Sequence, residues 1–269
     1  MPLVDHDIDA AAITDPGLKR TVNEDCYQLN KSLGFFLVAD GMGGHSAGAM
    51  ASRMAVTIIN DILKDCLVGN QRSDSNAQLK KCHSLIEYPN NQKDVKNFIE
   101  RAVRDANNTI YALNREHEYP DGAGMGTTFA GLCMTENNRE CTIFHVGDCR
   151  VYLCRHGVLR QLTQDHTLYQ ILKKSGRQEP LPGKNIILRA IGPWPHVDVE
   201  IHALTMQAND TFLICSDGLI EMMDDAQILD IIQDRHYSLE KRCKKMVAMA
   251  NEGGGLDNIT VALVQSPAR

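Results

Sequence analysis

Carboxylates stand beside short apolar runs at four places in the sequence, a pattern that is typical of a site for divalent cations. Removing a carboxylate from water is costly unless a partner compensates for its charge, and a bound cation would do so. Oxygen donors, with no His or Cys among them, favour hard octahedral ions such as Mg²⁺ or Mn²⁺ over Zn²⁺. One Asp-Gly alone predicts only a turn, but four acidic clusters favour a metal site: Glu24-Asp25, Asp40-Gly41, Asp217-Gly218 and Asp257-Asn258.

The elements that must position these acids are short buried strands. The runs Phe35–Ala39 and Thr211–Cys215 are apolar, rich in aromatic or branched residues, and followed by an acidic residue or by Ser-Asp-Gly. Such runs predict strands that deliver their last residues to one edge of a sheet. We therefore expect acids that are far apart in the sequence to converge at that edge.

The composition predicts one globular domain. The chain has 269 residues, of which 43% are hydrophobic and 23% charged, and these values are ordinary for a protein with a sizeable core. No linker rich in Pro, Gly or Ser divides it. We expect a single domain over 1–269 with a core at about 13–264.

The net charge of −6 opposes binding to nucleic acid or to an anionic membrane through bulk electrostatics. No apolar stretch approaches the roughly 18 residues of a membrane span, and the N-terminus lacks the layout of a signal peptide. We expect a cytoplasmic protein, and a monomer.

The nine cysteines predict reduced thiols rather than a disulfide framework, because the number is odd and several lie within apolar patterns. Cys66, Cys82 and His83 match no common zinc module. Cys149 and Arg155 have the Cys-x5-Arg spacing of cysteine-dependent phosphatases. The residues between them predict a strand rather than a loop that cradles phosphate, so we reject that mechanism.

The order of elements predicts an α+β fold. Apolar stripes predict amphipathic helices over 47–67 and 95–113, separated by a polar insert at about 69–93. Four strand-like runs between 127 and 162 predict an antiparallel meander. Further strands are expected at 186–191, 197–204, 211–215 and 258–264, with helices at 225–233 and 239–251.

An ordered set of motifs resembles that of the metal-dependent protein phosphatases, the PPM or type 2C family. The resemblance covers nearly the whole chain and implies two stacked antiparallel sheets flanked by helices on both outer faces, an α-β-β-α sandwich. The motifs are Arg20-x-x-Asn23-Glu24-Asp25, Ala39-Asp40-Gly41-Met42-Gly43-Gly44-His45, Gly126-Thr127-Thr128, Val146-Gly147-Asp148-Cys149-Arg150, Ser216-Asp217-Gly218-Leu219 and Asp257-Asn258-Ile259-Thr260.

The resemblance implies two ions, Mn²⁺ or Mg²⁺, with a possible weaker third. Two such ions activate a bridging water and polarise the phosphate ester. The implied bridging ligand is Asp40, with the Gly41 carbonyl, Glu24 and Asp25 in the same ligand set. Asp217 and Asp257 resemble the ligands of the other ion.

Three further residues take roles from the resemblance. Arg20 matches the arginine that holds the substrate phosphate, a role that suits its planar fork of donors. Asp148 matches a ligand of the third ion, although a turn Asp that accepts from backbone amides is the alternative. Asn258 is expected to support Asp257 through hydrogen bonds.

The chain departs from the animal members of the family directly after the Asp-Gly. Those members carry a His there, proposed as the general acid, whereas this chain has Met42. His45 favours a structural role near the start of the following helix, so the general acid stays open. The segment 165–184 resembles the variable flap of the family.

The expected function is metal-dependent hydrolysis of phosphoserine and phosphothreonine in proteins. The partners would be a phosphoprotein substrate and an opposing Ser/Thr kinase. Two alternatives stay open, namely a catalytically silent member that acts as a binding module and a phosphatase of small phosphorylated metabolites.

Overall fold

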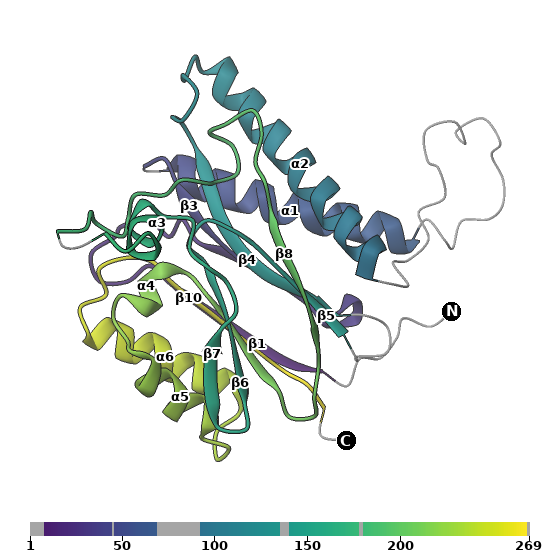
Figure 1. The fold of residues 1–269 in the computed structure, drawn as a ribbon, viewed down its shortest axis with the longest axis vertical. Helices are drawn as coiled ribbons and strands as arrows, with labels where there is room; N and C mark the ends of the chain where they lie inside the picture. The colour runs from purple at the N-terminus through teal and green to yellow at the C-terminus, as the bar shows by residue number, and fades with distance from the viewer. Residues whose placement is uncertain (1–7, 45, 69–91, 135–139, 178–179, 268–269) are drawn as a thin grey trace.

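Two five-stranded antiparallel sheets lie between two layers of helices in the structure, a computed structural model that describes residues 8–44, 46–68, 92–134, 140–177 and 180–267 (Figure 1). The first sheet has the order β1-β10-β9-β6-β7 and the second β2-β3-β4-β5-β8. The strands are β1 Asp9–Asp15, β2 Cys26–Asn30, β3 Phe35–Met42, β4 Gly126–Met134, β5 Glu140–Val146, β6 Arg150–Arg155, β7 Val158–Gln161, β8 Glu200–Thr205, β9 Thr211–Cys215 and β10 Ile259–Gln265.

The central strands are apolar on both faces because both faces are covered. In β3, Phe35 and Leu37 point to the outer helix layer while Phe36 and Val38 point to the other sheet. The side-chain period of two in a strand produces this alternation. The inner core contains residues of both sheets, which shows that they stack face to face. The expected α-β-β-α sandwich is therefore confirmed.

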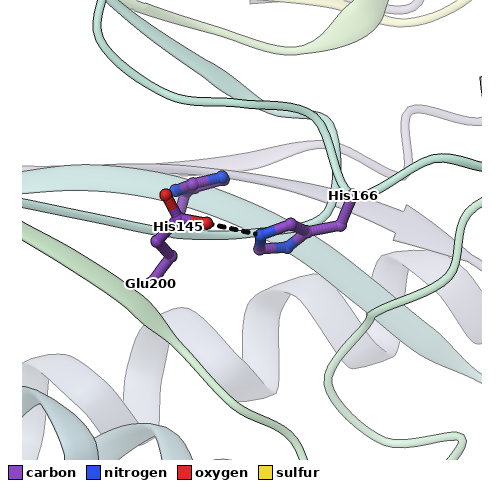
Figure 2. A group of neighbouring side chains, drawn as sticks. All are labelled: His145, His166 and Glu200. Atoms are coloured by element: carbon purple, nitrogen blue, oxygen red, sulfur yellow. Dashed lines mark hydrogen bonds and ion pairs between the residues drawn. The ribbon is translucent and has the colours of Figure 1, made fainter. Parts of the chain in front are cut away.

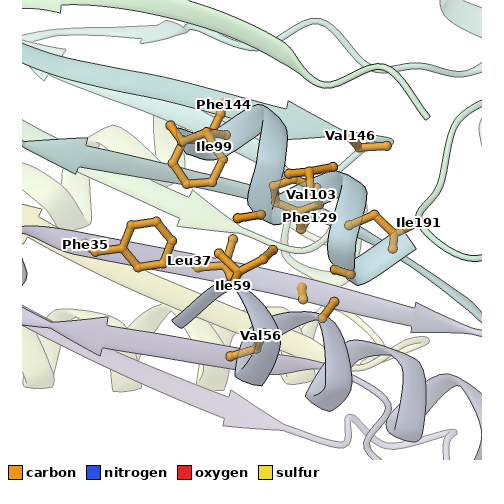
Figure 3. Packing of buried hydrophobic residues seen from close by; sticks show 14 of the residues in the cluster. Phe35, Leu37, Val56, Ile59, Ile99, Val103, Phe129, Phe144, Val146 and Ile191 are labelled. Carbon is orange, nitrogen blue, oxygen red and sulfur yellow. The ribbon is translucent and has the colours of Figure 1, made fainter. Parts of the chain in front are cut away.

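Two long helices cover the second sheet, α1 Ser46–Val68 and α2 Gln92–Glu116. Figure 3 shows Ile59 and Val103 among the side chains that pack against the aromatic residues of β3, β4 and β5. The first sheet is covered by α4 Asp217–Ile220, α5 Asp225–Gln233 and α6 Leu239–Glu252. The helices expected at 225–233 and 239–251 are thus present, the first with the expected bounds.

The expected antiparallel meander is wrong. β4 pairs with β5 in one sheet, whereas β6 pairs with β7 in the other, so the four strands form two hairpins. The chain crosses between the sheets at Gly147, which has a φ of 96°. A glycine adopts this conformation at little cost. This crossing places Asp148 between the ends of two strands in different sheets.

The strand expected at 186–191 is also wrong. Only two isolated bridges form there, Ile187 with Thr167 and Ile191 with Thr127. Ile186 and Leu188 are exposed, so the apolar character of this run does not reflect burial in a sheet. The preceding segment, expected as a flap, contains α3 Leu168–Lys174.

Some expectations fall outside the described residues. Of the insert at 69–93, residues 69–91 are not described, and the remaining two belong to α2. His45, Cys82 and His83, and the side chain of Cys66, also lie outside the description. Within the described residues, no helix is long and apolar enough to cross a membrane.

Candidate metal centre

The acidic residues of the sequence motifs meet at one edge of the sandwich because its strands are antiparallel. Asp40 lies near the end of β3 and Asp217 follows β9. Asp25 precedes β2 and Asp257 precedes β10, each the antiparallel partner of one of those strands. Asp148 joins them at the crossing between β5 and β6. In an antiparallel pair, the start of one strand lies beside the end of its neighbour. The residue before one strand and the residue after the other therefore lie at the same edge of the sheet.

Asp40 and Asp217 form the centre of this cluster, and each raises the cost of a negative charge on its neighbours. Burial raises the pKa of both carboxyls well above the ordinary value. The charges of Asp25, Asp217 and Asp148 raise the pKa of Asp40 further. Carboxylates that lie this close repel each other when no cation is bound. The site thus has an excess of negative charge that a divalent cation would neutralise.

Three buried carboxylate oxygens have no hydrogen-bond partner among the described residues, namely Oδ1 of Asp25, of Asp148 and of Asp217. Burial raises the pKa of Asp25 and of Asp148 to about 6. Unpartnered buried polar atoms are rare in folded proteins and call for an explanation. Oxygen atoms of this kind are the donors that Mg²⁺ and Mn²⁺ prefer. The residues therefore fit the expected metal.

The main chain around Gly41 packs too closely for any side chain. A Cβ atom on Gly41 would overlap the carbonyl group of Gly48, and one on Gly48 would overlap the carboxylate of Glu24. The Gly48 N–H donates to Oε1 of Glu24 at 3.1 Å. The Ser52 hydroxyl donates to the Glu24 carbonyl at 2.6 Å. The start of α1 thus holds Glu24 beside Asp40 and Gly41.

Arg20 lies at the rim of the cluster, with 53% of its side chain exposed. Its Nη2 donates to Oδ2 of Asp257 at 2.6 Å. The other oxygen of Asp257 accepts from the Asn258 N–H at 2.8 Å. The structure therefore brings Arg20 to the site and pairs it with one of the expected ligands.

Asn258 donates a hydrogen bond to Asp257, as expected, and has a further role. Its main chain, not its side chain, donates to Asp257. The side-chain oxygen accepts from the Glu24 N–H at 2.8 Å, and the side-chain nitrogen donates to the carbonyls of Pro16 and Val22 at 3.0 Å each. The Asn258 amide thus holds the loop that carries Arg20 and Glu24 against the first sheet.

The sequence analysis missed the hydrogen bonds behind the cluster. The Ser216 hydroxyl donates to Oδ2 of Asp25 at 2.7 Å. Arg150 forms a two-pronged ion pair with Asp165, with distances of 2.8 and 2.6 Å. Arg150 begins β6 two residues after Asp148, so this pair ties Asp165, the first residue of the expected flap, to the site. Ser216 and Arg150 belong to the recognised motifs, which was the available signal.

A histidine cluster lies behind this edge and links β5, the flap and β8 (Figure 2). Donor atoms of His145, His166 and Glu200 lie within 4.8 Å of one another. However, His166 Nδ1 accepts from the Gly147 N–H, so its proton is on Nε2, which faces Glu200 at 3.1 Å. The two imidazole rings also stack with an interplanar angle of 21°, so their in-plane lone pairs do not converge. We therefore assign no metal to this cluster.

The cysteine chemistry rejected from the sequence is also incompatible with the structure. Cys149 is fully buried, and burial raises the pKa of its thiol well above the ordinary value. Arg155 lies at the far end of β6 and pairs with Asp210. The described cysteines are free: Cys26, Cys133, Cys141, Cys149, Cys154, Cys215 and Cys243.

Buried carboxylates with free oxygens beside an exposed arginine, at one edge of a two-sheet sandwich, define a metal-dependent hydrolase of phosphate esters. Comparison with known proteins agrees with this class. The family model described as protein phosphatase 2C matches residues 19–251. The chain therefore belongs to the protein phosphatase 2C family and is a metal-dependent protein serine/threonine phosphatase.

Curated relatives match almost end to end. The chain is 34% identical over 260 residues to the serine/threonine phosphatase stp of Listeria innocua, covering 94% of this chain and 93% of the relative. It is 33% identical over 265 residues to the protein phosphatase PhpP of Streptococcus pneumoniae, covering 96% and 97%.

Solved structures share the fold. The serine/threonine phosphatase PstP/Ppp of Mycobacterium tuberculosis has a TM-score of 0.79 at 29% identity, covering 97% of this chain and 99% of that one. A catalytic domain of PstP in complex with two manganese ions has a TM-score of 0.75 at 29% identity, covering 96% and 97%.

Proposed function

We propose that this chain removes phosphate from phosphoserine and phosphothreonine in proteins at the carboxylate cluster, with Mn²⁺ or Mg²⁺ as the cofactor. The observation that carries the proposal is the set of unpartnered buried oxygens on Asp25, Asp148 and Asp217. The assignment to proteins rather than small molecules rests on the likeness to stp and PhpP.

The chain's own residues would hold the metal ions at the cluster. Glu24, Asp25, Asp40, Asp217, Asp257 and the Gly41 carbonyl would hold two ions, and Asp148 with Asp217 a weaker third. Divalent ions, when bound there, supply the positive charge that activates water and compensates the phosphoryl oxygens. Residues 1–269 would act as one phosphatase domain.

Arg20 would bind the substrate phosphate. Its Nη2 pairs with Asp257, which fixes the direction of the guanidinium group. Nε and Nη1 have no acceptor among the described residues and are available for phosphate oxygens. A planar fork of donors suits two such oxygens. No general acid is assigned, since Met42 has no proton to donate.

Metal removal tests the proposal directly. Protein treated with EDTA should not hydrolyse a phosphothreonine peptide, and added Mn²⁺ or Mg²⁺ should restore turnover. Alkylation of thiols should have no effect, because six of the seven described cysteines are buried. Full activity in the metal-stripped protein would contradict the metal-dependent mechanism.

Substrate comparison separates the remaining alternatives. A phosphopeptide should be hydrolysed with a higher kcat/KM than a sugar phosphate under the same conditions. The reverse order would identify a metabolite phosphatase, and no turnover of either with Mn²⁺ would identify a silent binding module. The opposing kinase and the cytoplasmic location stay predictions.

A further inference from the structure

A second cavity lies at the opposite end of the strands that carry the metal centre. It has a volume of about 450 Å³ and is lined by residues that include Cys154 of β6 and Thr211 of β9. These two residues pair with each other in the sheet, whereas the other end of the same ladder pairs Arg150 with Cys215, next to the metal centre. The cavity is therefore separate from the carboxylate cluster.

The charge of this cavity contrasts with the net charge of the protein. Its lining contains three arginines, Arg155, Arg235 and Arg242, and a single carboxylate, Asp210. Arg155 binds both oxygens of Asp210 at 2.8 and 2.6 Å, and the Asp210 side chain is 1% exposed. The positive charges of the other two arginines are therefore not compensated within the lining.

Arg242 is a buried, preoriented donor. Its Nε donates to the carbonyls of Asp234 and Tyr237 at 2.9 and 3.0 Å, and Nη1 donates to the Ile232 carbonyl at 3.1 Å. These bonds fix the plane of the guanidinium group, while Nη2 has no acceptor among the described residues. Because the side chain is held in place, a ligand at Nη2 would not have to order it.

Arg235 completes the anion site. It is exposed and has no ion pair or hydrogen bond within the part of the chain that the structure describes. Burial and then the charge of Arg235 lower the pKa of Arg242, while the charges of Asp234 and Asp9, which do not line the cavity, oppose this in part. An anion between two like charges would relieve their repulsion and gain charge-assisted hydrogen bonds.

The remaining polar lining is neutral. The side-chain amides of Asn209, Gln233 and Gln265 line the same cavity. Amides donate and accept hydrogen bonds, as recognition of hydroxyl groups or of a base requires. The volume lies within the usual range of about 300–1,000 Å³ for small-molecule sites.

We propose that this cavity binds a small phosphate monoester that carries hydroxyl or amide groups, such as a sugar phosphate or a mononucleotide. Its phosphate lies between Arg235 and Nη2 of Arg242, and its neutral part contacts the amides of Asn209 and Gln233. The cavity binds this ligand without hydrolysing it, since its one carboxylate is already paired with Arg155.

Calorimetric titration of the wild-type protein in EDTA tests the proposal without turnover. The probes are AMP, glucose 6-phosphate and 3-phosphoglycerate, with adenosine, glucose and inorganic phosphate for comparison. At least one phosphate monoester should bind saturably, and at least tenfold more tightly than inorganic phosphate. Saturable binding of none of the three would overturn the proposal, and binding no tighter than that of inorganic phosphate would reduce the site to a simple anion site.

Variants locate the binding. Arg235→Gln should weaken the phosphate monoester at least tenfold and leave phosphatase activity unchanged, while Arg160→Gln removes an exposed arginine outside the cavity and should have no effect. Gln233→Ala should weaken the monoester but not inorganic phosphate. Arg20→Ala should leave this binding intact. If Arg20→Ala abolishes it and Arg235→Gln does not, the ligand occupies the metal centre and the proposal is wrong.

Discussion

At the scale of single residues, Arg20 and Asp257 form an ion pair at the rim of the carboxylate cluster. Their 2.6 Å ion pair joins the expected phosphate-binding group to an expected metal ligand. Because both side chains are partly exposed, the pair itself adds little to folding stability. The ion pair instead orients the Arg20 side chain at the rim of the cluster.

Replacement of Arg20 tests this orientation. Arg20→Ala should lower kcat/KM for a phosphothreonine peptide roughly 10- to 150-fold, the equivalent of a lost charge-assisted hydrogen bond of about 1.5–3 kcal/mol. Arg20→Lys should recover part of the loss, because it keeps the charge but not the planar fork. Steady-state kinetics at saturating Mn²⁺ measure both.

Lys19→Ala provides the matched control, since Lys19 is the exposed neighbouring cation. It should leave kcat/KM unchanged. Equal kinetics for the Arg20 and Lys19 variants would remove Arg20 from the site.

At the scale of elements, the flap is attached to both sheets through side chains. Arg150 of β6 holds Asp165, and His145 Nε2 of β5 donates to the Gln164 carbonyl at 2.9 Å. On the other side, Glu200 of β8 accepts from His166 and His202. Burial by itself would raise the pKa of Glu200, but these hydrogen bonds lower it. The flap therefore begins at a fixed position beside Asp148.

We expect the folded protein to lose stability in mild acid, because His145 is buried. Burial lowers its pKa to about 4, whereas an unfolded histidine titrates near 6.5. Between about pH 6.5 and pH 4, the unfolded state therefore binds more protons than the folded state. The stability that neutral His145 contributes is therefore present above pH 6.5 and is lost across that window, by up to about 1.4 kcal/mol per pH unit.

Urea unfolding of the wild type and of His145→Gln between pH 8 and 5 measures this effect. Gln keeps a donor for the Gln164 carbonyl but does not titrate, so the variant should lose less stability with falling pH. His117→Gln, which removes an exposed histidine, should behave as the wild type. Parallel pH dependence for all three proteins would show that His145 does not titrate as inferred.

At the scale of the whole molecule, the metal centre opposes the stability of the metal-free fold. Asp25 and Asp148 are buried, Asp40 and Asp217 are half-buried beside them, and desolvation raises the pKa of each. The hydrophobic cores between the sheets and under the two helix layers must offset the cost of this cluster. Bound cations would remove the cost, so metal binding and folding should be coupled.

Thermal unfolding tests this coupling. In EDTA, Asp217→Asn should raise Tm by about 2–4 °C if it relieves about 1 kcal/mol of repulsion. Mn²⁺ should raise the Tm of the wild type more than that of the variant. Asp230→Asn, an exposed substitution in α5, should change neither value. A lower Tm for metal-free Asp217→Asn would contradict the repulsion that we infer.

The sequence alone determined the elements with strong periodicity and the identity of the acidic cluster. The continuous apolar runs of β3 and β9 predicted buried strands, and the apolar stripes at 47–67 and 95–113 predicted the helices α1 and α2, because local patterns reflect local burial. Asp40 and Asp217 could be identified because each belongs to a motif, and the motifs follow one another in a recognisable order. The nearby groups Ser216 and Asp165 received no role, since a hydrogen bond across the fold leaves no local signal.

Only the tertiary structure decided which elements and side chains meet. Strand pairing depends on contacts between distant segments, so the run from β4 to β7 could not be assigned to two sheets from its pattern. The apolar run at 186–191 likewise had the composition of a strand but forms only two isolated bridges, to Thr167 and Thr127. The Asn258 side chain supports the Arg20 loop, and the arginines of the second cavity converge from β6, the segment after α5 and α6. These arrangements depend on packing between segments that are far apart in the sequence, so residue spacing along the chain does not predict them.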